Sequence, residues 1–163
     1  MKAMKKILAF ALAGVMALAL LTGCGTGGSA SHKSIAKAMA DHDNGHWGKT
    51  TITYTSSPEL DAKLQSLAAK PEFEDVVKKV YNDKTLSISP SDVPSGKVVC
   101  LCCGKYDKDA GKQAINLNVH YAYISTNTNL ADERQIGLIT TSFIDDTGNK
   151  VKVRFAVVVS PKS

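Results

Sequence analysis

The sequence predicts an α+β domain in which N-terminal helices pack on a four- to five-stranded antiparallel meander sheet. Three observations predict it. Apolar residues recur at helical spacing between residues 57 and 83, the pattern changes to alternation after Asp83, and short turns rich in glycine and asparagine separate the later segments. Short connections favour an antiparallel meander, and helices followed by strands are typical of the α+β class.

Three helices are expected in the first half of the domain. The first covers residues 32–41 and should end at the polar run 43–45, so that His42 and His46 would not share one continuous helix. The second begins at Ser57 and Pro58, which supply a capping hydroxyl and a first-turn proline. The third follows Pro71 and carries a stripe at i, i+3, i+4, i+7 and i+8, formed by Phe73, Val76, Val77, Val80 and Tyr81.

Strands are predicted mainly in the second half of the chain, at 50–55, 85–89, 97–103, 114–125, 135–144 and 150–160. The last of these alternates most clearly. One face should pack against the helical stripe at 73–81, and the other should be solvated. The inward face comprises Val151, Val153, Phe155, Val157 and Val159, and the outward face comprises Lys150, Lys152 and Arg154.

The chain begins with a segment typical of protein export. Lys2, Lys5 and Lys6 precede an apolar run from residue 7 to residue 21, which is short for a permanent membrane span. The run ends in Leu21-Thr22-Gly23-Cys24. This ending resembles the lipobox of bacterial lipoproteins, in which an aliphatic residue and two small residues precede a cysteine.

The resemblance implies cleavage before Cys24 and attachment of diacylglycerol to its thiol. Residues 1–23 would then be the signal peptide, and Cys24 would anchor the chain to a bacterial membrane on its extracytoplasmic side. Residues 24–33 combine the lipidated cysteine with a glycine- and serine-rich tether, and residues 34–163 form a single domain. The membrane is therefore the first expected partner of this chain.

The charge of the chain predicts no nucleic-acid partner. The formal net charge is +5, but three of the 20 basic residues and none of the 15 acidic residues lie in the signal. The mature chain is therefore close to neutral and has no basic run that would suggest nucleic-acid binding.

Three cysteines lie within four positions of the strand predicted at 97–103. If this strand forms a hairpin with 114–125, Cys103 opposes Ile115 on an apolar face. Cys100 and Cys102 would then share a polar face with His120. The same residues allow three states, which are free thiols, a local disulfide, and a Zn²⁺ or Cu⁺ site made by Cys100, Cys102 and His120. The C-x-C-C spacing does not match the paired zinc signatures.

Catalytic motifs are missing from the sequence, since neither G-x-S-x-G nor H-E-x-x-H occurs. We therefore expect a protein that is not an enzyme. It should be a membrane-anchored lipoprotein of the cell envelope that acts as a binding or interaction module for a protein or small molecule. One alternative is a thiol-dependent metal-binding or redox lipoprotein that uses Cys100, Cys102 and His120. Another is a structural envelope protein.

Overall fold

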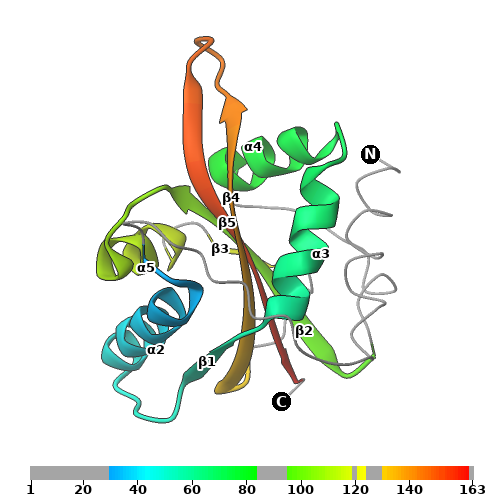
Figure 1. Ribbon diagram of the computed structural model, residues 1–163. Helices are drawn as coiled ribbons and strands as arrows, with labels where there is room; N and C mark the ends of the chain where they lie inside the picture. Colours follow the sequence, from blue (N-terminus) through cyan, green and yellow to red (C-terminus); the bar gives the residue numbers. More distant parts are fainter. Residues whose placement is uncertain (1–29, 84–94, 119–120, 124–129, 162–163) are drawn as a thin grey trace.

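The computed structural model describes residues 30–83, 95–118, 121–123 and 130–161 (Figure 1). The strand predicted at 85–89 and residue His120 lie outside these ranges. The described elements, in chain order, are α2 (His32–Trp47), β1 (Thr53–Ser56), α3 (Pro58–Ala68), α4 (Phe73–Asp83), β2 (Lys97–Lys105), α5 (Ala110–Asn118), β3 (Tyr121–Tyr123), β4 (Glu133–Ile144) and β5 (Lys150–Pro161).

The five strands form one mixed sheet in the order β1-β4-β5-β2-β3. The α+β class is confirmed, but the prediction of a purely antiparallel meander is wrong. β1 runs parallel to β4, whereas the other neighbours are antiparallel. A parallel pair needs a long crossover, and the chain supplies it because α3, α4, β2, α5 and β3 all lie between β1 and β4 in sequence.

Helices cover both faces of the sheet (Figure 1). α3 and α4 pack on one face, where their apolar residues join those of β2, β4 and β5 in a first core. α2 and α5 pack on the other face and enclose a second core. The prediction that all helices precede the sheet in sequence is therefore wrong, because α5 lies between β2 and β3.

α5 replaces the first part of the strand predicted at 114–125, residues 114–118, whereas residues 121–123 form β3 as predicted. Ile115 and Leu117 alternate as in a strand, but Ala110, Ala114 and Leu117 also recur at helical spacing. The helical pattern prevails because Ala114 and Leu117 bury against α2 and the sheet, while Ile115 stays 49% exposed. Asp109 caps the first turn, since its Oδ1 accepts a hydrogen bond from the Lys112 amide at 2.9 Å.

α2 begins where it was predicted to begin but extends beyond its predicted end. It starts at His32, and the Ser31 hydroxyl accepts a hydrogen bond from the Ser34 amide. It then runs through Gly45 and ends at Gly48, whose φ of 61° is the left-handed conformation that terminates helices. The expected break at residues 43–45 is wrong because side chains in this segment bond to the rest of the domain. Asn44 bonds to the backbone of Ile52, just before β1, and Asp43 bonds to Tyr54 of β1.

The packing predicted for the last strand is confirmed on its inward face. Val153, Phe155 and Val157 lie in the first core beside the apolar stripe of α4. The rings of Phe73 and Phe155 are 5.2 Å apart in an edge-on arrangement, which is favourable for aromatic pairs. Tyr81 and Val151 pack at the margin of the same core.

The outward face of β5 is solvated only in part. Lys150 and Lys152 are exposed, as predicted, but Arg154 is only 2% exposed. The prediction fails at Arg154 because α2 and α5 cover this face, so that Ala156 and Val158 are buried as well. A strand buried on both faces cannot alternate between apolar and polar residues along its whole length.

Carboxylates from two helices cap the open edge of β4 beyond its short partner β1. Asp61 of α3 accepts a hydrogen bond from the Leu138 amide at 2.7 Å, and Glu74 accepts one from the Ile144 amide at 2.9 Å. Asp61 also contacts His32 of α2 at 2.8 Å. Such capping protects an edge strand from pairing with another chain, and it ties the two helical layers together at this edge.

Replacing Val153 with alanine is expected to lower the free energy of unfolding by about 1–3 kcal/mol, because it removes buried methyl groups between β5 and α4. Chemical denaturation of the variant and the wild type measures the change. A denaturation midpoint equal to that of the wild type would contradict the packing of this face.

Candidate functional site

All three cysteines of the domain lie in β2, which is buried on both faces. Cys103 belongs to the first core, and Cys100 and Cys102 belong to the second. The predicted alternation is therefore confirmed, but the predicted polar face is wrong. β2 does pair with β3, inside the predicted range 114–125, but in another register, with Cys100 opposite Tyr123 and Cys102 opposite Tyr121. On its other side β2 pairs with β5, where Val158 and Ala156 are the partners of the same two cysteines.

Burial makes these thiols weak acids. Desolvation raises the pKa of Cys100 and of Cys103 to about 12 and raises the pKa of Cys102 well above its ordinary value of 9.0. The thiolate is the form that binds metals and attacks electrophiles. At neutral pH these groups are therefore protonated side chains of the core, and the described cysteines are free.

A metal site that uses Cys100, Cys102 and His120 stays a prediction. His120 lies outside the described residues, so its position relative to the sulfurs is not defined. Among the residues that the structure describes, no three or more histidine, cysteine or acidic side chains converge in a way that could hold a metal ion.

The native protein is expected to resist thiol reagents at pH 8 and to react at Cys100, Cys102 and Cys103 only after unfolding. The thiol pKa values are higher in the folded protein than in the unfolded chain. Below pH 9 the thiols are protonated in both states and do not make the free energy of unfolding depend on pH. Between about pH 9 and 12 only the unfolded chain loses these protons, so the free energy of unfolding should fall as pH rises. Titration with a chromophoric disulfide, with and without denaturant, measures the reactivity. Rapid reaction of the folded domain, with Cys24 replaced by serine, would contradict the buried placement.

A buried polar network lies on the same side of the sheet as Cys100 and Cys102. Arg134 donates from Nη1 to Asp43 Oδ2 at 2.8 Å and to the Tyr54 hydroxyl at 2.8 Å. The Tyr54 hydroxyl in turn donates to Asp43 Oδ2 at 2.6 Å. Arg134, Asp43 and Tyr54 are each no more than 8% exposed. We call these three residues the buried triad.

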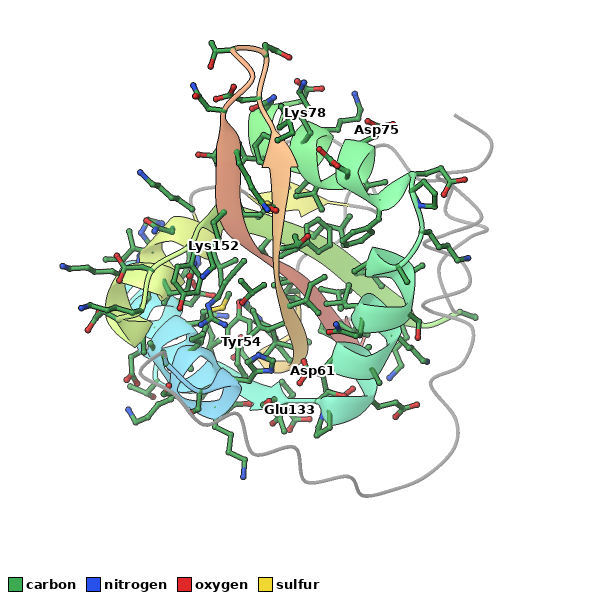
Figure 2. All side chains as sticks on the ribbon, turned by 45° about the horizontal axis from the view of Figure 1, so that its top comes forward. Tyr54, Asp61, Asp75, Lys78, Glu133 and Lys152 are labelled. Atoms are coloured by element: carbon green, nitrogen blue, oxygen red, sulfur yellow. The ribbon has the colours of Figure 1, made fainter. Side chains whose placement is uncertain are left out.

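Three elements supply the triad. Asp43 comes from α2, Tyr54 from β1 and Arg134 from β4, and the parallel register of β1 and β4 places Tyr54 beside Arg134. The Arg134 guanidinium also lies 5.2 Å from the centre of the Tyr54 ring. Figure 2 shows Tyr54 on the side of the sheet that α2 covers. The triad thus connects α2 to the edge of the sheet.

The electric field of the triad reaches the cysteines. The positive charge of Arg134 lowers the pKa of Cys100 and Cys102, while the negative charge of Asp43 raises that of Cys102, but desolvation is the larger cause for both thiols. Because the charges of Arg134 and Asp43 compensate each other, the network does not generate a thiolate. We therefore assign the buried triad a structural role.

The C-terminal turns of α2 carry three aromatic rings close in sequence to Asp43 of the triad, at residues 42, 46 and 47. The His42 and His46 rings are nearly parallel with centroids 6.3 Å apart, and Trp47 meets His46 edge-on at 4.8 Å. Trp47 is 66% exposed. His42 Nδ1 lies 3.4 Å from Asp43 Oδ1. The helix that was expected to break before His46 instead presents both histidines on one face.

The first described residue of the chain is held firmly in the domain. The Ala30 amide donates to the Lys108 carbonyl at 3.0 Å, and the Ala30 carbonyl accepts from Arg154 Nη2 at 3.4 Å. Two cations lie near the Tyr106 ring, with Lys152 Nζ 3.9 Å and the Arg154 guanidinium carbon 5.1 Å from its centre. Arg154 Nε has no hydrogen-bond partner among the residues that the structure describes.

Comparison with known proteins identifies no relative. No family model matches the chain, and neither a curated protein nor a solved structure matches it significantly. Within the described ranges, no helix is both long and apolar enough to cross a membrane.

Sequence reasoning did not find the buried triad. Asp43 and Arg134 are separated by 91 positions, and neither position carries a local pattern that predicts burial. The one available signal was an arginine shortly before the apolar run 136–139, which needs a carboxylate partner if it is buried.

Proposed function

We propose that this chain is a bacterial lipoprotein whose domain is held at the extracytoplasmic membrane surface by diacylglycerol on Cys24 and acts as a binding or interaction module. The single observation that carries the proposal is the Leu21-Thr22-Gly23-Cys24 sequence directly after a basic start and an apolar run. Stable anchoring to a membrane requires more than one acyl chain, and a diacylglycerol supplies two.

The start of the domain supports this arrangement. Only residues 25–29 separate Cys24 from Ala30, whose backbone is hydrogen-bonded to Lys108 and Arg154. At no more than about 3.6 Å per residue, these six steps span at most roughly 20 Å. A domain attached in this way stays at the membrane surface, with Ala30 within roughly 20 Å of the lipidated cysteine.

The opposite end of α2 supports a binding role. A helix of 16 residues is about 24 Å long, so the rings at its last turn are displaced from the Ala30 end by about that distance. Trp47 is exposed there on a helix fixed by the buried triad. Exposed aromatic side chains on a rigid base are common at the centre of protein interfaces. We expect partner contacts at this end of α2.

The thiol-dependent alternative has less support. A redox role for Cys100 and Cys102 needs thiolates that solvent can reach, whereas both sulfurs lie in an apolar core. The structural alternative predicts that the domain has no ligand. The fluorescence of Trp47 distinguishes the structural role from the binding role. The chain has one tryptophan, so a change in its emission reports contact at this end of α2.

Replacing Cys24 with serine is expected to prevent lipid attachment and to move the protein from the membrane fraction to the soluble fraction, or to leave the signal uncut. The reason is that a hydroxyl cannot replace the thiol as the acceptor of the lipid. Fractionation of cells that carry radiolabelled fatty acid measures both outcomes, with Cys103→Ser as the matched control that keeps its lipid. A Cys24→Ser variant that is still lipidated would contradict the proposal.

A further inference from the structure

We propose that the surface around Ala30 is a membrane-contact face that rests on anionic lipid headgroups. We call it the anchor face and define it by Lys33, Lys108, Lys112, Ile115 and Lys152. The inference rests on the proposed lipid anchor at Cys24 and goes further, since an anchor alone does not determine which side of the domain meets the bilayer.

The position of Ala30 brings this face near the membrane. Lys108 bonds directly to Ala30 through its carbonyl, and Lys33 is three residues further along the chain. Lys152 is linked to Ala30 through Tyr106 and Arg154. Figure 2 shows Lys152 on the side of the sheet that carries α5, away from Lys78 on α4. The short link of residues 25–29 therefore attaches the lipid beside these cations.

The lysines of the anchor face are available to bind anions. Lys33, Lys108, Lys112 and Lys152 are exposed, and none of them forms an ion pair with a described carboxylate. Elsewhere on the surface several lysines are paired with acids, as Lys37 is with Asp41, Lys78 with Asp146 and Lys79 with Asp83. Contact with headgroups would therefore not break existing ion pairs on this face.

The two nearby acids are already engaged in the turn before α5. Asp107 Oδ1 accepts from the Asp109 amide, and Asp109 Oδ1 accepts from the Lys112 amide, both within 2.9 Å. They reduce the positive charge of the face but do not reverse it. Arg154 adds a buried positive charge beneath the surface without a carboxylate partner among the described residues.

Ile115 gives the face an apolar point of contact. It is 49% exposed and follows Lys112 by one helical turn, so both side chains lie on the outer side of α5. A basic surface with an exposed aliphatic residue matches a bilayer interface, because lysines meet anionic headgroups while the aliphatic group enters the acyl boundary. This pairing favours an anionic bilayer over a soluble anion as the occupant.

Lysine modification measures the contact directly. The mature chain is coupled through Cys24 to a maleimide lipid on the outside of preformed vesicles, made of phosphatidylcholine alone or mixed with phosphatidylglycerol. The buried cysteines do not compete for coupling. A soluble amine reagent is then added, and mass spectrometry reads the modification rate of each lysine. Lys97 is the control, because it is exposed at the opposite end of β2 from the turn that holds Lys108.

On vesicles that contain phosphatidylglycerol, the modification rates of Lys108 and Lys112 are expected to fall several-fold relative to phosphatidylcholine vesicles, while the rate of Lys97 stays unchanged. High salt should reverse the protection, because it screens the attraction between lysines and headgroups. In the Lys108→Gln/Lys112→Gln variant, the protection of Lys33 and Lys152 should be lost while the denaturation midpoint is retained.

Equal rates on the two kinds of vesicle, or equal protection of Lys97 and Lys112, would overturn the anchor face. The result does not depend on whether cells lipidate Cys24, since the coupling supplies the anchor chemically. Failure of the lipoprotein assignment would appear instead in the fractionation of the Cys24→Ser variant.

Discussion

Replacing Arg134 with methionine is expected to lower the free energy of unfolding by about 3–5 kcal/mol, because it leaves the Asp43 carboxylate buried without its cation. Asp43 is 5% exposed, and its Oδ2 accepts from both Arg134 and Tyr54. Methionine restores much of the volume of arginine but none of its donors. The effect is therefore mainly electrostatic and can be measured by equilibrium denaturation at pH 7.

The matched control is Lys79→Met, which removes a cation from the exposed pair with Asp83. Exposed helical ion pairs contribute at most about 1 kcal/mol, so this variant should unfold close to the wild type. The double variant Asp43→Asn/Arg134→Met should lose less free energy of unfolding than the sum of the losses of the two single variants. The reason is that the double variant leaves no unpaired charge of the Asp43–Arg134 pair in the core. A loss below about 1 kcal/mol for Arg134→Met would contradict the assignment of the triad as a buried clamp.

Replacing Gly104 with alanine is expected to destabilise the domain by about 1–3 kcal/mol or more, because α5 lies directly against this residue of β2. A Cβ at position 104 would lie 2.5 Å from the carbonyl carbon of Asn116 and 2.9 Å from the Leu117 amide nitrogen. These atoms belong to the helix backbone and cannot move aside as a flexible side chain can. The whole of α5 would have to shift away from the sheet.

Gly45→Ala is the control for this substitution and has the opposite expected sign. Gly45 lies inside α2, and a Cβ there would meet nothing within 4 Å. Alanine in a helix interior is favoured over glycine by about 1 kcal/mol, so the control should be neutral or more stable than the wild type. Equal denaturation midpoints for Gly104→Ala and the wild type would contradict the close packing of α5 on β2.

Local patterns predicted the parts of the fold whose environment is simple. The stripe of α4 and the inward face of β5 each repeat with a single period, and both lie in the first core as expected. α5 was missed because Leu117 fits a strand with Ile115 and a helix with Ala114, and only tertiary packing against α2 and the sheet favours the helix. A nine-residue segment cannot show this from its own composition.

Among the candidate sites, too, those that depend on a local sequence could be predicted, and those that depend on tertiary contacts could not. The Cys24 assignment depends on a short contiguous sequence and needs no tertiary contact. In contrast, the chemistry of Cys100 and Cys102 depends on what covers β2. The predicted register placed Cys100 opposite residue 118, whereas β3 pairs it with Tyr123 and α2 and α5 cover this face. The pairing of Asp43 with Arg134 joins an early helix to a late strand, so no local pattern indicates it.

The most direct test of the central claim is the intact mass of the protein purified from bacterial membranes, recorded with and without reductant and chelator. The lipoprotein assignment predicts a chain that begins at Cys24, carries a diacylglycerol and does not change mass on treatment with reductant or chelator. An unmodified chain that begins at any other residue and carries no lipid would contradict the assignment.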